Sequence, residues 1–328
     1  MLLAGDIGGT KTLLGLFETV PERPRPILVR SFGTLDHADL QTMIAEFLKE
    51  AEAGEVRAAH GAIESACFGV AGPVVGDTVK VTNVPWFVDG RLVAAALGIQ
   101  RVALLNDLEA LAHAVPVLRG SETHVLQDGA ALRGGNIGLI AAGTGLGQAL
   151  IHNIDGRFVP SASEAGHADF AARTEREIAL VRDLTRRYGR ADVEHVVSGR
   201  GLVNIHRLAH RQPCAAAVDL ESPDAPAGIS TAAMERQCPG CVETLDMFVE
   251  AYGAEAGNLA LRSVSTGGLY IGGGIAPKIL PALTTGAFMR AFRAKPPLDS
   301  MLAAMPVQVI LNTEAGLLGA AVFAASGR

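Results

Sequence analysis

The sequence predicts an α/β protein of two domains, because short apolar runs typical of strands alternate with amphipathic segments typical of helices, and one strand–turn–strand motif occurs twice. The two copies lie at residues 2–17 and 137–154, each with a glycine-rich turn between apolar runs. A chain of 328 residues can form two domains with a core each. We expect a small domain of residues 1–115 and 312–328, and a large domain of residues 116–311 with helical insertions.

The first glycine-rich turn is the sharpest functional signal in the first half. Gly8 and Gly9 expose backbone N–H groups that can bind an anion, and Thr10 and Lys11 add a hydroxyl and a positive charge, so we expect phosphate there. Asp6 closes the strand before the turn. A Walker A loop does not fit, because Thr10 separates glycine from lysine and a strand follows. A purely structural turn remains the alternative.

The rest of the first half supplies polar residues at the end of a buried strand. Asn106 and Asp107 directly follow the apolar run 102–105, and side chains at the carboxyl ends of buried strands commonly line a site. The alternative is that the pair only caps the next helix. The other expected elements are strands at 27–32 and Ser65–Val70, helices at 38–53, 91–97 and 108–115, and a small hairpin and loop at 76–86 that contains Asn83.

The second turn repeats the first, with Gly143, Thr144 and Gly145 between strands 137–142 and 149–154. A dinucleotide-binding turn is the competing interpretation. Its third glycine would lie farther along the chain than Gly147, and a helix would follow rather than a strand. We therefore expect a second phosphate loop.

The remainder of the second half contains helices and a late glycine cluster. Gly272, Gly273 and Gly274 end a short strand at 269–271, where backbone can lie against the flat face of adenine and ribose, unless the glycines only serve a crowded helix–sheet crossing. The other expected elements are helices at Glu175–Tyr188, 201–210, 242–262 and 314–325, a strand at 307–311, and a mobile surface loop at 212–229.

Composition excludes several classes of protein. The net charge of −6 and the lack of a basic stripe argue against a nucleic-acid partner. No apolar run is long enough to span a bilayer, and the first strand begins directly after Met1, so we expect a cytoplasmic protein with no membrane partner.

The four cysteines are too few for a disulfide framework, and we expect reduced thiols. Only Cys238 and Cys241 have the spacing of metal ligands. A zinc site would need a second pair or histidines that the local sequence does not supply, so we expect no structural zinc, and Pro239 to start a helix.

Taken together, these motifs resemble the actin-like ATPase superfamily, and within it the bacterial glucokinases of the hexokinase-like, non-ROK kind. The likeness runs nearly end to end. It is carried by residues 5–10, 82–83 before Trp86, 105–107, 143–147, 164–167, Glu194 ahead of 198–204, 257–260 and 271–274. The resemblance implies two ribonuclease H-like domains with mixed sheets flanked by helices and an active-site cleft between them. It also implies ATP-dependent phosphorylation of glucose to glucose 6-phosphate with Mg²⁺, the first step of glycolysis, by a homodimer.

The resemblance also assigns roles to residues. Asp107 is the catalytic base, and an aspartate can orient the sugar hydroxyl and take its proton late in the reaction. Asp6 binds Mg²⁺ through water. The residues implied for glucose are Asn83, Asn106, Asp107, Glu164, His167 and Glu194, and those implied for ATP are Asp6, Gly8, Gly9, Thr10, Lys11, Gly143, Thr144, Gly145, Gly273 and Gly274.

The chain departs from the family pattern at three positions. Lys11 replaces a common asparagine, which bears on the choice of phosphate donor, and Ser163 and Ala165 replace glycines around Glu164, which bears on the fit of the sugar. ROK kinases share the pattern around His167 but follow it with a cysteine-rich zinc loop, whereas the next cysteine here is Cys214.

Three other functions are weighed against a glucokinase. A sugar-responsive repressor of the ROK type carries an N-terminal DNA-binding domain, for which no residues precede the first strand. A chaperone or filament ATPase would leave Glu164, His167 and Glu194 without a purpose. A hydride-transferring dehydrogenase requires 143–147 to be a true dinucleotide turn. The range of sugars and the use of ADP or polyphosphate stay open.

Overall fold

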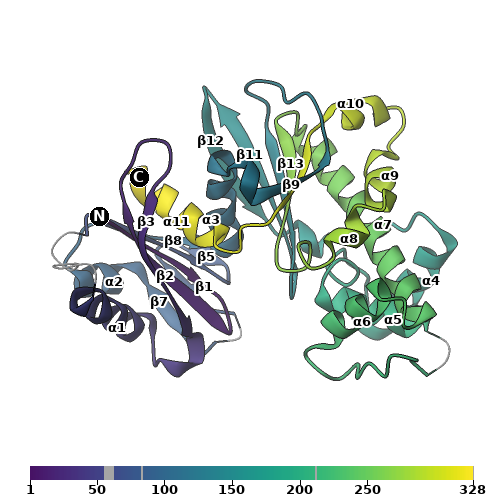
Figure 1. Cartoon of the computed structure of the whole chain (residues 1–328), viewed down its shortest axis with the longest axis horizontal. Coiled ribbons are helices and arrows are strands. Elements are labelled where there is room, and N and C mark those ends of the chain that lie inside the picture. Colours follow the sequence, from purple (N-terminus) through teal and green to yellow (C-terminus); the bar gives the residue numbers. More distant parts are fainter. Residues whose placement is uncertain (55–62, 83, 211–212, 328) are drawn as a thin grey trace. The chain divides into compact units, whose positions relative to one another are not determined.

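The computed structural model describes residues 1–54, 63–82, 84–210 and 213–327 (Figure 1). The chain divides into two compact units. Unit 1 comprises Met1–Arg119 and Asn312–Arg328, and unit 2 comprises Gly120–Leu311. Each unit has its own sheet and its own hydrophobic core.

Unit 1 is built on a five-stranded sheet with the order β3-β2-β1-β4-β8. The three strands β1, β2 and β3 are antiparallel neighbours, whereas β1, β4 and β8 run parallel. The bounds are β1 Leu2–Ile7, β2 Lys11–Glu18, β3 Arg25–Gly33, β4 Ser65–Val70 and β8 Val102–Asn106. A small separate sheet contains β5 Val74–Val75, β6 Thr78–Lys80 and β7 Phe87–Asp89.

Helices cover both faces of this sheet (Figure 1). They are α1 Leu40–Ala53, α2 Gly90–Leu97, α3 Asp107–Ala114 and α11 Ala315–Ala325. Successive side chains of a strand point to opposite faces. Leu3 and Ile7 of β1 accordingly pack in the cluster that contains α1, whereas Leu2 and Ala4 pack with α3 and α11. By this alternation Asp6 lies on the face covered by α3 and α11.

Unit 2 is built on a six-stranded sheet with the order β12-β11-β10-β13-β14-β9. The strands β10, β11 and β12 are antiparallel neighbours, β10, β13 and β14 run parallel, and β9 adds an antiparallel edge. The bounds are β9 Thr123–Gln127, β10 Ile137–Ala142, β11 Leu146–Ile154, β12 Arg157–Ser163, β13 Gly268–Gly272 and β14 Val307–Ile310. Apart from β9, the order and directions of the strands repeat those of unit 1.

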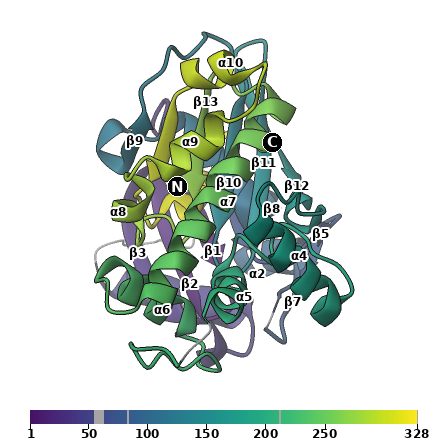
Figure 2. The ribbon, with the colours of Figure 1, turned by 90° about the vertical axis from the view of Figure 1, so that its right-hand side faces the viewer.

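Most helices of the chain belong to unit 2. They are α4 Glu175–Tyr188, α5 Gly199–Ala209, α6 Ala225–Met234, α7 Pro239–Ser263, α8 Leu280–Leu283, α9 Ala287–Arg293 and α10 Asp299–Ala304. Helix α7 is the centre of the core, because its Phe248, Tyr252 and Leu259 are buried against β10 and β13. Figure 2 shows α5, α6 and the first turns of α7 gathered together. The 3₁₀-helices are Thr34–Asp36, Val115–Val117, Gly120–Glu122 and Ala165–His167.

The structure differs from the expected secondary structure in two places. The edge strands β9 and β12 were not predicted; β12 carries Pro160 and mostly polar or small residues, so its apolar alternation is weak. The loop expected at 212–229 is wrong in its second part, since α6 begins at Ala225 and buries Ile229. Among the described residues, none of the helices is both long and apolar enough to cross a membrane.

The expectation that Cys238 and Cys241 lack partners for a metal is also wrong. The fold brings Cys214, His206 and His210 to them from the end of α5 and the segment that follows it. These residues are 24 to 35 positions away along the chain, so local spacing could not reveal them. As predicted, Pro239 occupies the first turn of a helix, α7. All four cysteines are free thiols in the structure.

Candidate active site

In unit 1, the turn between β1 and β2 is fixed from one side by Thr34. The Thr34 hydroxyl donates to the carbonyl of Gly8 at 2.9 Å and lies 2.9 Å from the Thr12 hydroxyl, and its backbone N–H donates to the carbonyl of Thr10 at 3.0 Å. Thr10 and Lys11 are exposed. The turn is therefore rigid at its base while its tip faces solvent. Thr34 was not predicted, because it follows β3 and nothing in its neighbourhood marks it.

Asp6 lies one residue before the end of β1, against the start of α11. A Cβ atom at Gly316 would lie 2.7 Å from Asp6 Oδ2, so only glycine allows the helix to approach this carboxylate. Burial, and after it the charge of Asp107, raise the pKa of Asp6 to about 6, although the charge of Lys11 acts in the opposite direction. Asp6, Lys11 and Asp107 therefore share one electrostatic environment in unit 1.

Asn106 and Asp107 lie where β8 ends and α3 begins. Asn106 Oδ1 accepts from the N–H of Leu108 at 3.0 Å, and its Nδ2 donates to the carbonyl of Gly72 at 3.1 Å. Asn106 is therefore the cap of α3, the alternative raised from the sequence. Asp107 Oδ1 also accepts from Leu108 N–H, at 2.8 Å, and the residue is exposed. This bond fixes one carboxylate oxygen of Asp107 and thereby orients the other.

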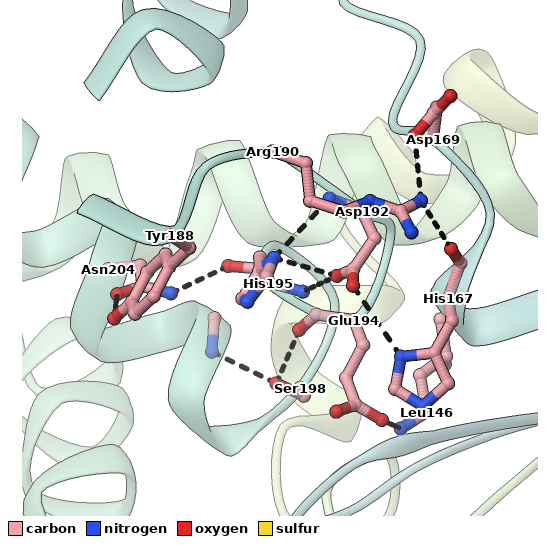
Figure 3. A network of polar contacts seen from close by, with 11 residues as sticks. Leu146, His167, Asp169, Tyr188, Arg190, Asp192, Glu194, His195, Ser198 and Asn204 are labelled. Carbon is pink, nitrogen blue, oxygen red and sulfur yellow. Dashed lines mark hydrogen bonds and ion pairs between the residues drawn. The ribbon is translucent and has the colours of Figure 1, made fainter. Parts of the chain in front are cut away.

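In unit 2, the second glycine turn is held by Glu194. Its Oε2 accepts from the N–H of Leu146 at 2.9 Å, and a Cβ atom at Gly145 would lie only 2.5 Å from that oxygen (Figure 3). The carbonyl of Gly143 accepts from the N–H of Gly199 at 2.8 Å, where α5 begins. The turn is thus braced by α5 and by Glu194, and Thr144 at its tip is exposed.

Glu164 precedes the 3₁₀-helix that follows β12, His167 is the last residue of that helix, and both are exposed. The N–H of Glu194 donates to the carbonyl of Gly166 at 2.8 Å, so this helix is bonded to the segment that carries Glu194. The structure therefore brings His167 and Glu194 together, as Figure 3 shows.

A polar network that was not predicted supports His167 (Figure 3). The carboxylate of Asp192, which is buried, lies 3.5 Å from His167 Nδ1 and 2.9 Å from His195 Nδ1. The His195 ring stacks on Tyr188 at 4.5 Å between centroids. Arg190 donates to the carbonyl of His167 at 2.7 Å. The sequence pointed to this network only in that most of its residues lie close to Glu194 along the chain.

The glycines after β13 have two different roles. Gly273 has a φ of +82°, and a Cβ atom there would lie 2.3 Å from the carbonyl oxygen of Ala142, so it is required by the close approach of β10. The crowding expected as an alternative is real, but the neighbour is a strand rather than a helix. A Cβ atom at Gly274 would meet nothing within 4 Å, which leaves open backbone there. Asn83 lies outside the described residues.

Comparisons with known proteins cover both units. A family model described as Glucokinase matches residues 3–327. The chain is 41% identical over 344 residues to a glucokinase of Nostoc punctiforme, covering 99% of each. The crystal structure of a glucokinase from an Antarctic psychrotroph has a TM-score of 0.86 at 27% identity, covering 99% of this chain and 98% of that one. A ROK family glucokinase from Streptomyces griseus, solved with glucose and AMPPNP, has a TM-score of 0.65 at 25% identity and covers 99% of each chain. These structures have the actin-like ATPase fold, which is therefore the fold of this chain.

Proposed function

The chain belongs to the glucokinase family, and we propose that it transfers the γ-phosphoryl group of ATP to the 6-hydroxyl of D-glucose with Asp107 as the catalytic base. That it is a sugar kinase which phosphorylates glucose follows from the family match and from the 41% identity along its whole length. The donor, the reacting hydroxyl, the metal and the roles of single residues are the proposed part.

The position of Asp107 is the observation that carries the proposed mechanism. A base for this reaction needs a carboxylate that is exposed to substrate and held in one orientation. Asp107 is exposed, and the N–H of Leu108 binds its Oδ1 at 2.8 Å. The other oxygen would take the proton of the sugar hydroxyl as the phosphoryl group is transferred. Its place at the first turn of α3 favours the ionised carboxylate, because helix N-termini stabilise negative charge.

Asp6 fits the proposed role in Mg²⁺ binding. Mg²⁺ prefers oxygen ligands, keeps several waters, and often needs only one or two carboxylates. The charge of Asp107 disfavours ionisation of the neighbouring Asp6, and a divalent cation would relieve that repulsion. When bound, Mg²⁺ supplies charge neutralisation at the phosphates. The chain's own contribution is a carboxylate fixed between β1 and Gly316 of α11.

The two glycine turns are the proposed phosphate contacts. In unit 1 the backbone of 8–11 and the Lys11 amine would bind phosphate oxygens, with Thr34 holding the turn in shape. In unit 2 the backbone of 143–145 would do so. Gly274 leaves room for adenosine against its backbone. AMPPNP in the Streptomyces griseus relative supports ATP as the donor.

Glucose is proposed to contact Asn106, Glu164, His167 and Glu194, together with Asn83 and Asp107. Each offers donors or acceptors that suit sugar hydroxyls. Oε2 of Glu194 accepts from the N–H of Leu146 in the glycine turn of unit 2, so Glu194 would link sugar binding to the geometry of that phosphate loop. His167 is steadied by Asp192 through Nδ1, which keeps its other nitrogen for substrate. The homodimer implied by the resemblance also stays a proposal, and sedimentation equilibrium should give about twice the mass of one chain.

The test of this mechanism is Asp107→Asn. Asparagine keeps an oxygen for the N–H of Leu108 but cannot take the proton, so kcat should fall by roughly 10²- to 10⁴-fold, as for a lost general base. Glucose binding measured by calorimetry should persist. Asp77→Asn, an exposed acid of the same unit, serves as the control and should keep wild-type kcat. A folded Asp107→Asn enzyme with near-normal kcat would refute the assignment, and ADP release across a panel of hexoses tests the preference for glucose.

A further inference from the structure

A cluster of three cysteines and two histidines lies in unit 2 at the junction of α5 and α7. His206 is in the last turn of α5, His210 follows its last residue, and Cys214 is four residues farther on. Cys238 is the cap of α7 and Cys241 lies in its first turn. The nitrogen and sulfur atoms form two groups of potential metal ligands, one with His206 and Cys241 and one with His210 and Cys238, and Cys214 belongs to both.

The sulfur–sulfur distances match a metal site rather than a disulfide. Cys214 Sγ lies 3.8 Å from Cys238 Sγ and 3.7 Å from Cys241 Sγ. A disulfide requires about 2.05 Å. Two thiolates on a tetrahedral zinc ion, with Zn–S of about 2.3 Å, are about 3.8 Å apart. The Sγ atom of Cys214 therefore lies about as far from each of the other two sulfur atoms as two thiolates on one zinc ion lie from each other.

His210 offers a nitrogen as a fourth potential ligand. Its Nε2 lies 3.0 Å from Cys238 Sγ, so an imidazole nitrogen already contacts the thiol group. The sequence spacing then consists of two close pairs, His210 with Cys214 and Cys238 with Cys241, separated by a longer segment. Paired ligands of this spacing are typical of structural zinc sites.

His206 has a different place in the cluster. Its Nδ1 lies 3.2 Å from the Thr244 hydroxyl, and that hydroxyl donates to the carbonyl of Gly240 at 2.7 Å. Since the hydroxyl proton is used on Gly240, Thr244 accepts from His206 Nδ1. His206 is buried and its ring lies 4.7 Å from that of His210, and because Nδ1 is used on Thr244, its Nε2 is the alternative to His210 as the fourth ligand.

A plain apolar core is the competing explanation of this cluster. Buried cysteines behave as small hydrophobic side chains, and Cys238 and Cys241 are 1% and 0% exposed. That account covers the thiols alone. A thiol–imidazole hydrogen bond and thiol–thiol contacts account for the single distances, but not for three cysteines and two histidines gathered at one point. A zinc ion explains these observations together.

We propose that Cys214, Cys238, Cys241 and His210 bind one structural zinc ion. Four protein ligands close a tetrahedral site, so the ion has no open position for chemistry and acts as a staple between α5, the segment after it, and α7. The thiols give up their protons when they bind the metal. His167 takes no part, which separates this site from the one expected of ROK kinases. The proposal reverses the absence of zinc expected from the sequence and is independent of the kinase mechanism.

The staple would act at the end of α5 that is remote from the phosphate loop. The first residue of α5, Gly199, bonds to Gly143, whereas His210 follows the other end. An 11-residue helix is about 16 Å long, so the ion would secure α5 without touching substrate. Loss of zinc should lower thermal stability far more than the kcat of the molecules that stay folded.

The experiment measures zinc in the full-length protein, purified with added zinc chloride and then freed of loosely bound metal. Elemental analysis should give one zinc per chain, and titration of wild-type thiols with an organomercurial should release it to a metallochromic indicator. Cys214→Ser and Cys241→Ser should lose the zinc, and Cys67→Ala should keep it, because Cys67 is a buried cysteine of unit 1 outside the cluster. His210→Asn should lose or weaken zinc binding, whereas His206→Asn should retain it.

The zinc content of the wild-type protein decides the test even if a variant fails to fold. Absence of zinc from the wild type after zinc loading would overturn the proposal, as would a disulfide between any two of the three cysteines found by peptide mapping of unreduced protein. Zinc that persists in folded Cys214→Ser and Cys241→Ser would place the metal elsewhere. Loss of zinc from His206→Asn with retention in His210→Asn would overturn the choice of the fourth ligand.

Discussion

Asp6→Asn should make the metal-free protein more stable while disabling it as a kinase. Burial, and after it the charge of Asp107, raise the pKa of Asp6 from its ordinary 3.8 to about 6, which means that keeping it ionised at pH 7 costs folding free energy. A difference of roughly two pH units corresponds to about 3 kcal/mol of the free energy of unfolding. Because the residue is partly exposed, solvent screens some of this cost, and we expect a gain of about 1.5–3 kcal/mol from the neutral amide.

The sign of this effect depends on pH in a defined way. Between pH 3.8 and about 6 the folded state binds more protons at Asp6 than the unfolded state does, so the contribution of Asp6 to stability falls as pH rises through that window. Urea unfolding of wild type and Asp6→Asn, with EDTA, should therefore give equal stabilities near pH 4 and a more stable variant at pH 7. Asp77→Asn controls for the loss of an exposed acid from the same unit.

Magnesium provides the functional half of the same test. If Asp6 holds Mg²⁺ through water, added Mg²⁺ with nucleotide should stabilise wild type more than the variant, and kcat/KM of the variant should fall by about 100-fold or more. A variant no more stable than wild type at pH 7, or a stability difference that persists at pH 4, would refute the electrostatic reasoning. Full Mg²⁺-dependent activity in the variant would refute the metal role alone.

Two further predictions concern how the glycine turns are held. Gly145→Ala should lower the free energy of unfolding in urea by about 1–3 kcal/mol, because its Cβ would lie 2.5 Å from Glu194 Oε2 and disturb the bond of that oxygen to the N–H of Leu146. Gly143→Ala should lower it far less, because a Cβ there would meet nothing within 4 Å. Equal costs would contradict this account. Thr34→Val should raise KM for ATP and cost about 1–2 kcal/mol, since it leaves the Gly8 carbonyl without its hydroxyl donor. Unchanged kinetics would show that the turn keeps its shape unaided, and Thr78→Val, which loses a hydroxyl–carbonyl bond outside the turn, is the control.

The elements that sequence could predict are those whose signal is local. Strands β1, β4 and β10 are continuous apolar runs, and both glycine turns lie between such runs, so periodicity and composition sufficed. Helix α7 was predicted to within a few residues because it is long and begins at a proline. The family resemblance then supplied the candidate site residues, whose roles stay predictions, because it rests on the order of several motifs rather than on any one of them.

The features that sequence could not predict depend on contacts between distant segments. Burial is the largest cause of the raised pKa of Asp6, and α11 packs against this carboxylate at Gly316, 310 residues away. The cluster around Cys214 forms only where α5 and α7 meet. Asp192 can be assigned a role only once the structure places His167 and His195 beside its carboxylate. Glu194 alone resembles a solvated helix charge, whereas the structure bonds it to the turn at Leu146. Short edge strands such as β12 fail for another reason, since their exposed side chains carry little alternation.

The two sheets repeat their strand order, yet equivalent positions serve different purposes. The last paired residues before the turns are Ile7 in β1 and Ala142 in β10, so the counterpart of Asp6 is Ala141, and only one half carries the acid. A 3₁₀-helix follows the edge strand β3 in unit 1 and the edge strand β12 in unit 2, and each lies against the glycine turn of its unit. In unit 1 it braces the turn through the hydroxyl and N–H of Thr34.

In unit 2 the equivalent 3₁₀-helix approaches its turn through a residue without a side chain. A Cβ atom at Gly166 would lie 2.2 Å from the carbonyl oxygen of Leu146, so the backbone itself makes the contact. Bracing the turn then falls to Glu194, which bonds to the carbonyl of Gly166 and to the N–H of Leu146. The side chains of Glu164 and His167 are thereby left exposed at a position that unit 1 uses for structure. The two sheets therefore differ at this position: in unit 1 the 3₁₀-helix itself braces the glycine turn, whereas in unit 2 Glu194 braces it and the 3₁₀-helix presents side chains to solvent.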